Sequence, residues 1–160
     1  MFKIFIILLI LINIFACEPI KQAANNKSKQ QVLDFTCLTS QHICDVNTEL
    51  GQFTIHFAGE SQQGKIKTEL PFQIKLSFNS PEESTQIKKI TSYLEGKSMF
   101  MGKVPVFFQN EPKNTMLAES LLASCSEEIM TWRLWFQIEI NADGKIHQQD
   151  FFVDFDSVRL

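Results

Sequence analysis

The residues of this 160-residue chain that are best suited to chemistry carry sulfur: four cysteines and five methionines. Met99 and Met101 stand two apart, just before Gly102, and Cys125 is followed five residues later by Met130. Two residues two apart in a strand point the same way, and a glycine beside them permits a bend or a bulge. Thiolate and thioether sulfurs are soft donors that select Cu(I) over hard cations. The spacing therefore indicates a candidate Cu(I) site, with packing of these methionines in the core as the alternative.

The first sixteen residues have the pattern of an export signal. The single cation Lys3 precedes a nearly unbroken apolar run over residues 4–12. This run is too short to cross about 30 Å of hydrocarbon as a helix that rises about 1.5 Å per residue. It has the length of the apolar region of a signal peptide. We therefore interpret residues 1–16 as a signal peptide that is removed.

The four residues Ile14, Phe15, Ala16 and Cys17 resemble the lipobox of bacterial lipoproteins, with an aliphatic first residue, a small third residue and a cysteine at the fourth position. The resemblance implies that Cys17 becomes the lipidated first residue of the mature protein, and that its acyl chains anchor the protein to a membrane. An ordinary secretory signal with an incidental Cys17 is the alternative. Glu18 is not the aspartate that marks retention in the inner membrane. We therefore expect a periplasm-facing protein of the bacterial envelope, with the outer membrane favoured over the inner.

The segment that follows the proposed anchor is polar. Residues 17–31 contain few apolar side chains, so we expect a lipidated cysteine and a flexible tether there, and a folded domain over residues 32–160. Lys3 is the only charged residue of the signal, so its removal changes the formal net charge from −3 to −4. A mildly acidic body of this kind is not drawn flat onto an anionic membrane surface.

If Cys17 carries lipid, three cysteines remain for other chemistry. Cysteines of an exported protein normally pair. We predict a disulfide between Cys37 and Cys44, because the short intervening segment can turn back and bring the two Cα atoms within about 6 Å. Cys125 then stays reduced, either as a metal ligand or as a small buried apolar residue. Cys37, His42 and Cys44 also have the spacing of half a zinc site, but the sequence offers no second pair at the spacing of a structural site.

Charge and motif content argue against nucleic-acid binding and against catalysis. Charged residues make up 21% of the chain and the balance is slightly acidic, which is unlike a basic nucleic-acid-binding domain. The sequence contains no Walker loop, nucleophile elbow, Cys-x-x-Cys or His-Glu-x-x-His motif. Asp150, Asp154 and Asp156 alternate near the C-terminus, and an exposed, charged edge strand is their simplest explanation. We therefore expect a protein that is not an enzyme and that has no nucleic-acid partner.

The apolar residues of the domain recur mainly at every second position. This alternation is clear over residues 52–59 and 70–78, and it is typical of half-buried antiparallel strands. It is clearest over residues 130–140, which a turn at 141–144 connects to a returning strand over 145–155. These patterns predict an all-β fold, an antiparallel immunoglobulin-like β-sandwich of seven or eight strands, with a closed barrel as the main alternative.

The order Met99-x-Met101-Gly102, followed by Cys125-x4-Met130-x-Trp132, resembles small periplasmic β-sandwich proteins that include YtkA-like and FixH-like domains. This resemblance covers roughly residues 70–140 and implies a link to copper delivery or cytochrome oxidase assembly.

Two functions follow from these residues. One is a lipid-anchored envelope module that binds a protein partner or serves a structural role, without a small ligand. The other is a periplasmic metallochaperone that holds Cu(I) through Cys125 together with Met99, Met101 or Met130. Convergence of the Cys125 sulfur with two methionine sulfurs within about 5 Å would distinguish the second function from the first.

Overall fold

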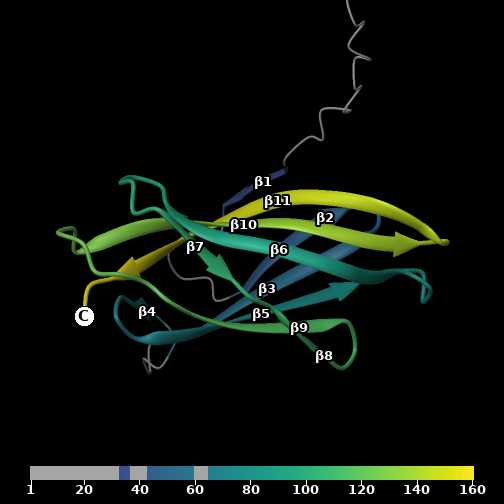
Figure 1. Ribbon diagram of the computed structural model, residues 1–160, viewed down its shortest axis with the longest axis horizontal. Helices are drawn as coiled ribbons and strands as arrows, with labels where there is room; N and C mark the ends of the chain where they lie inside the picture. Colours follow the sequence, from purple (N-terminus) through teal and green to yellow (C-terminus); the bar gives the residue numbers. More distant parts are fainter. Residues whose placement is uncertain (1–32, 37–42, 60–64) are drawn as a thin grey trace, which may run out of the picture.

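The computed structural model describes residues 33–36, 43–59 and 65–160, and for residues 33–36 it describes the backbone alone (Figure 1). The predicted signal peptide, Cys17, the predicted tether, Cys37 and His42 therefore lie outside the described residues. Every regular element in the described part is a β-strand. None of the described segments forms a helix that could cross a membrane.

In the described part of the chain, eleven strands form two sheets. Sheet A has the order β1 (Leu33–Thr36), β11 (Lys145–Val158), β10 (Ile129–Ala142), β6 (Gln86–Gly96) and β7 (Lys103–Val106), with the short β4 (Ile66–Lys67) also paired to β11. Sheet B has the order β2 (Ile43–Thr48), β3 (Gly51–Gly59), β5 (Pro71–Asn79), β9 (Thr115–Leu121) and β8 (Gln109–Glu111). Pairing is antiparallel throughout, except that β1 and β4 run parallel to β11.

The strand order is that of an immunoglobulin-like sandwich. If β3, β5, β6, β8, β9, β10 and β11 are lettered A to G along the chain, one sheet contains the order A-B-E-D and the other contains C-F-G. The predicted sandwich is thus confirmed, and the two separate hydrogen-bonded sheets exclude the closed barrel. The predicted number of strands was wrong, because β1, β2, β4 and β7 are added at or beside the edges. A strand as short as β4 has too few residues to show a period in the sequence.

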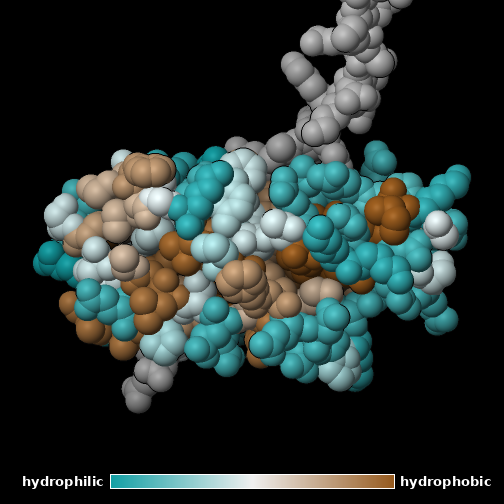
Figure 2. All heavy atoms as spheres, in the orientation of Figure 1, coloured by the Kyte–Doolittle hydropathy of each residue, from teal (hydrophilic) through white to brown (hydrophobic). Residues whose placement is uncertain are grey.

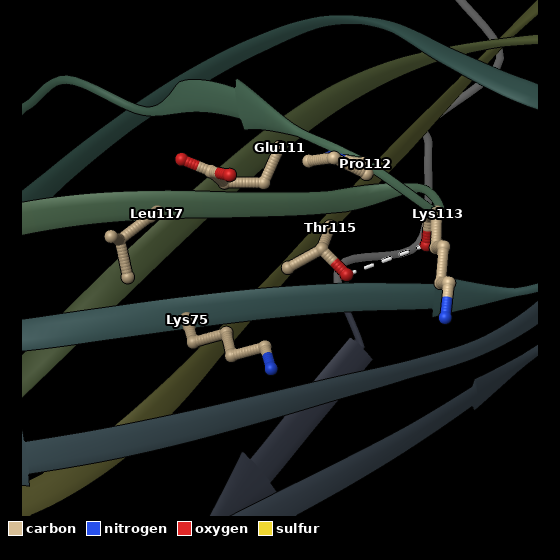
Figure 3. A pocket seen from close by; sticks show the side chains of 6 residues that line it. All are labelled: Lys75, Glu111, Pro112, Lys113, Thr115 and Leu117. Carbon is tan, nitrogen blue, oxygen red and sulfur yellow. Dashed lines mark hydrogen bonds between the residues drawn. The ribbon is translucent and has the colours of Figure 1, made fainter.

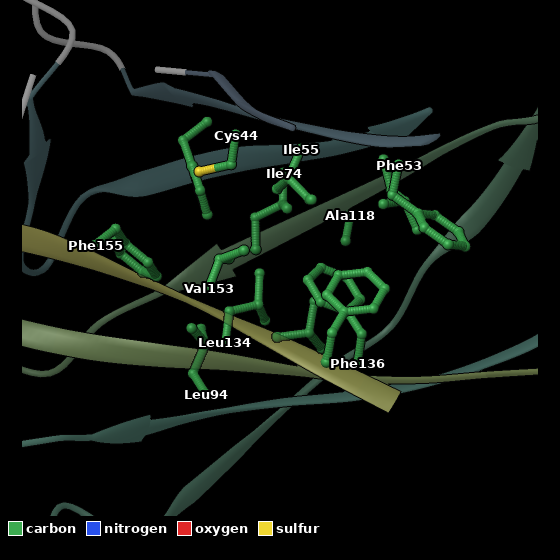
Figure 4. Close-up of a cluster of buried hydrophobic side chains, with 14 of the residues drawn as sticks. Cys44, Phe53, Ile55, Ile74, Leu94, Ala118, Leu134, Phe136, Val153 and Phe155 are labelled. Atoms are coloured by element: carbon green, nitrogen blue, oxygen red, sulfur yellow. The ribbon is translucent and has the colours of Figure 1, made fainter. Parts of the chain in front are cut away.

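The core lies between the sheets, where alternate side chains of both sheets meet (Figure 4). All six inward positions predicted for β10 are buried: Met130, Trp132, Leu134, Phe136, Ile138 and Ile140. Phenylalanines join the two sheets, since the ring of Phe53 in β3 lies 5.1 Å from that of Phe151 in β11. Burial of one such side chain contributes about 1.5–3 kcal/mol, so the aromatic content of the chain is largely explained by the core.

The two ends of the sandwich are closed differently. The turns at 80–85 and 141–144 close one end, which we call the hairpin end. The connections at 97–102 and 122–128, together with the C-terminal residues 158–160, form the other, which we call the loop end (Figure 1, left). Met99 and Met101 lie in one of these connections, between β6 and β7. Their predicted placement on a strand was therefore wrong, because Gly96 ends β6 before the methionines are reached.

Candidate functional site

A pair of sulfur atoms meets at the loop end. Cys125 follows β9, and its Sγ lies 3.5 Å from the Sδ of Met130 near the start of β10. Met130 is 2% exposed and points into the core, whereas Cys125 is half-buried. Cys125 is a free thiol, as predicted. Since Met130 is one of the alternating inward residues of β10, the sheet itself places its sulfur beneath the Cys125 connection.

Gly96 brings a second methionine to this point. A Cβ added at Gly96 would overlap the Cε of Met130 and the carbonyl oxygen of Met99, and it would lie 3.4 Å from the Cγ of Met101. The missing side chain thus leaves the space in which Met101 and Met130 approach each other. Met101 is half-buried against the core. Of the predicted ligands, the structure therefore brings the sulfurs of Cys125 and Met130 together. Met101 meets Met130 at Gly96 through its Cγ, whereas Met99 approaches Gly96 through its backbone.

An ion cluster around a buried carboxylate, which we call the aspartate clamp, fixes the start of the 97–102 connection. Lys97 donates its backbone N–H to the Thr131 carbonyl at 3.0 Å, and its Nζ lies 2.6 Å from Asp154 Oδ2. Arg133 donates to the same carboxylate in a bidentate arrangement, from Nε at 2.8 Å and from Nη2 at 3.0 Å. The Asp154 side chain is 1% exposed. The interpretation of Asp154 as part of an exposed edge was therefore wrong, because β11 has neighbours on both sides and the two cations cover the carboxylate.

Burial and charge oppose each other at Asp154. Burial by itself raises the pKa of this carboxyl, but the hydrogen bonds and positive charges of Arg133 and Lys97 outweigh it and hold the pKa below its ordinary value of 3.8. Asp154 is therefore ionised at neutral pH and ties Lys97, and with it the start of the 97–102 connection, to β10 and β11.

Exposed apolar side chains gather around this site. Five of the eight large exposed apolar residues among the described residues lie at the loop end, and we call them the apolar rim: Met99, Phe100, Leu121, Ile129 and Leu160. Phe100 is the most exposed, at 91%.

Backbone hydrogen bonds fix two of the segments that carry the apolar rim. Arg159 N–H donates to the Glu128 carbonyl at 2.9 Å, and Glu69 N–H donates to the Leu122 carbonyl at 2.8 Å. In Figure 2, hydrophobic residues, drawn brown and tan, gather at this end of the visible face, whereas the hairpin end is mostly hydrophilic and drawn teal.

A row of aromatic residues crosses the outward side of sheet A. Phe152, Trp135 and Tyr93 face one another on β11, β10 and β6. Arg133 lies 3.6 Å from the Phe152 ring centroid, and Trp135 donates from Nε1 to Glu95 at 2.6 Å. This row was not predicted from the sequence, although its aromatic residues share the outward positions of three alternating strands. Cross-strand packing of this kind stabilises a sheet.

The outward side of sheet B has a shallow hollow between β5, β8 and β9 (Figure 3). The ammonium groups of Lys75 and Lys113 point to one side of it, and the Glu111 carboxylate points to another. All three side chains are exposed. The hollow offers hydrated surface charges and no arrangement of a nucleophile with a base.

Of the predicted disulfide pair, the structure describes Cys44 alone, which is buried in β2. Cys37 lies outside the described residues, and the disulfide therefore stays a prediction. Within the described part of the chain, no three His, Cys, Asp or Glu side chains converge on one point.

Comparisons with known proteins support the fold. No protein-family model matches the chain, and no curated protein does. A DUF4785 family protein from Legionella pneumophila is similar in structure, with a TM-score of 0.55 and 11% identity. The match covers 70% of this chain and 29% of that protein's chain, so this chain spans less than a third of the neighbour's length. At this identity the likeness shows the fold alone.

A superoxide reductase (neelaredoxin) from Ignicoccus hospitalis matches less well, with a TM-score of 0.39 and 15% identity over 68% of this chain and 80% of that one. A TM-score this low does not establish a common fold.

Proposed function

We propose that this protein is a lipid-anchored, non-enzymatic module of the bacterial envelope that docks a protein partner on its apolar rim. The observation that carries the proposal is the 91% exposure of Phe100, on a connection that the aspartate clamp holds in place. A large aromatic side chain that stays in water costs free energy unless a partner covers it. Aromatic side chains are also among the residue types that contribute most to binding at protein interfaces.

The surroundings of the rim favour a protein over a membrane as its partner. Glu127 and Glu128 are exposed beside Ile129, and Arg159 is exposed beside Leu160. Apolar side chains bordered by charges of both signs are typical of the centre and the margin of a protein interface. Adjacent carboxylates would instead be repelled by an anionic membrane surface.

The lipid anchor and the location come from the sequence alone. The Ile14-Phe15-Ala16-Cys17 pattern supports attachment of the chain to the envelope through Cys17. Delivery of Cu(I), the alternative function, would use the same end of the sandwich, because the Cys125–Met130 pair lies beneath the apolar rim.

A photo-crosslinking amino acid placed in intact cells tests the docking function. At position 100 we expect a discrete adduct with one envelope protein, and at position 146 no such adduct, although Ile146 at the hairpin end is an equally apolar residue with 60% exposure. The adduct protein is then purified, and its affinity is measured for the chain and for two variants. Phe100→Ser should weaken binding at least about 10-fold, as expected for the loss of a central aromatic residue, whereas Ile146→Ser should not. Equal adducts from both positions, or equal affinities, would contradict the proposal.

A further inference from the structure

We propose that Cys125, Met130 and Met101 form a binding site for one Cu(I) ion at the loop end. The inference concerns a cation and does not depend on the docking of a protein on the apolar rim. It rests on the distance between two sulfur atoms, on the space left by Gly96 and on the connection that carries Met101.

The spacing of the first two sulfur atoms already suits a shared ion. Metal–sulfur bonds are about 2.3 Å long in zinc–thiolate sites. With bonds of that length, two sulfurs 3.5 Å apart, as Cys125 Sγ and Met130 Sδ are, subtend roughly 100° at the ion. This angle lies between those of tetrahedral and square coordination, so the pair needs only a small opening to reach trigonal coordination. The two ligands are thus held at ligand-to-ligand distance by the fold.

Met101 supplies the third donor. Its side chain lies beside that of Met130 at Gly96. The thioether chain of methionine is unbranched and has three rotatable bonds, which lets its sulfur adjust its position. Gly102, which follows it, has a φ of 76° and open space around its Cα. This left-handed conformation, which favours glycine, allows the chain to turn into β7 directly after the third ligand.

The chemistry of the three donors selects the ion. One thiolate and two thioethers are soft ligands suited to Cu(I). Zn²⁺ takes four ligands from thiolate, imidazole and carboxylate groups. No three such groups converge anywhere in the described residues. The sulfur set therefore favours a monovalent soft ion over the commoner divalent ones.

Binding needs no redox step. The Cys125 thiol loses its proton to solvent as the sulfur bonds to Cu(I), and the two thioethers bind as neutral donors. The site then carries no net charge, which suits the partly apolar surroundings of Met130. Cys125 and Met101 are half-buried, so the ion reaches Met130 from the side of these two residues.

Competition with a Cu(I) chelator tests the site. The full chain, solubilised in detergent, is titrated anaerobically in the presence of ascorbate. We expect one Cu(I) per chain and X-ray absorption that shows sulfur neighbours. Cys125→Ser should lower the affinity by roughly 100-fold, and Met130→Leu and Met101→Leu by roughly 10-fold each.

Met116→Leu is the matched control. Met116 is also buried, but it lies in β9 of sheet B and pairs with Leu76. Leu fills nearly the same volume as Met, so all three methionine variants should fold. The proposal would be overturned if the unaltered chain failed to compete with the chelator, if Cys125→Ser bound equally well, or if Met116→Leu lost as much affinity as Met101→Leu. Each of these results would leave the crosslinking result at position 100 unaffected.

Discussion

The strands of this sandwich are connected differently at its two ends. At the hairpin end, β10 and β11 are joined by Asp143 and Gly144, both with positive φ, which is the geometry of a tight two-residue hairpin turn. At the loop end, the connections 97–102 and 122–128, both longer than that two-residue turn, lie beside a thiol, two thioethers, the aspartate clamp and five exposed apolar side chains. A tight turn leaves no room for side-chain chemistry, whereas a longer connection held by a rigid scaffold does.

The aspartate clamp should be the most costly part of the loop end to remove. Asp154→Ala leaves Arg133 partly buried without its carboxylate, and we expect a loss of about 3–5 kcal/mol in the free energy of unfolding. Asp150 lies on the half of β11 nearer the hairpin end and has a hydrogen bond only from Gln148 among the contacts described. Asp150→Ala should therefore change stability by less than about 0.5 kcal/mol. Urea denaturation of both variants measures the difference, and equal losses would remove the distinction between the two ends.

The clamp also predicts how stability depends on pH. The pKa of Asp154 is lowered in the folded protein, so its stabilising contribution is complete well above pH 3.8 and is lost as the pH falls through the folded pKa. Stability measured from pH 7 downwards should therefore fall more steeply below pH 3.8 in the unaltered chain than in Asp154→Asn. Parallel curves for the two proteins would show that this carboxyl does not carry the effect.

A covalent link is predicted for sheet B, apart from both ends. If Cys37 and Cys44 are paired, Cys44→Ala should cost about 2–3 kcal/mol. Peptide mapping without reduction should find the Cys37–Cys44 link and an alkylated Cys125. A Cys44–Cys125 link would contradict both the pairing and the copper site.

Substitution of Gly96 should destabilise the protein more than substitution of a glycine at the hairpin end. A Cβ at Gly96 meets Met130 Cε and the Met99 carbonyl, so Gly96→Ala should cost about 1–3 kcal/mol and weaken Cu(I) binding. Gly144 has open space around it, and asparagine tolerates its positive φ, so Gly144→Asn should cost less than about 1 kcal/mol. Calorimetric melting of the two variants gives the comparison. A larger loss at Gly144 would show that backbone conformation outweighs the crowding at Gly96.

The smallest expected effect on stability is at the apolar rim. Phe100→Ser should change the free energy of unfolding by less than about 0.5 kcal/mol, because the side chain is 91% exposed. Ile146→Ser at the hairpin end should behave likewise in denaturation. Loss of partner binding in the first variant alone would then reflect docking and not folding. A large loss of stability in Phe100→Ser would show that the side chain packs on the domain in solution.

Much of the fold could be predicted from alternation. The inward side of β10, from Met130 to Ile140, and its return in β11 follow from residues that alternate over many positions, because a strand points successive side chains to opposite faces. The short strands β4 and β8 could not be predicted in this way, since two or three residues carry no period.

The sequence by itself determined that Met130 faces the core, that residues 141–144 form a turn, and that Cys125 has soft donors within reach along the chain. These are local properties, set by side-chain alternation and by the conformations that Asp and Gly permit. Only the tertiary structure decided that Asp154 is covered by Lys97 and Arg133, and that Met101 meets Met130 at Gly96. Those contacts join residues that are distant in sequence, and the pairing of β6 with β10 and of β10 with β11 creates them. A residue's alternation pattern says which face of a strand it occupies, but the neighbour it meets there depends on the register between strands.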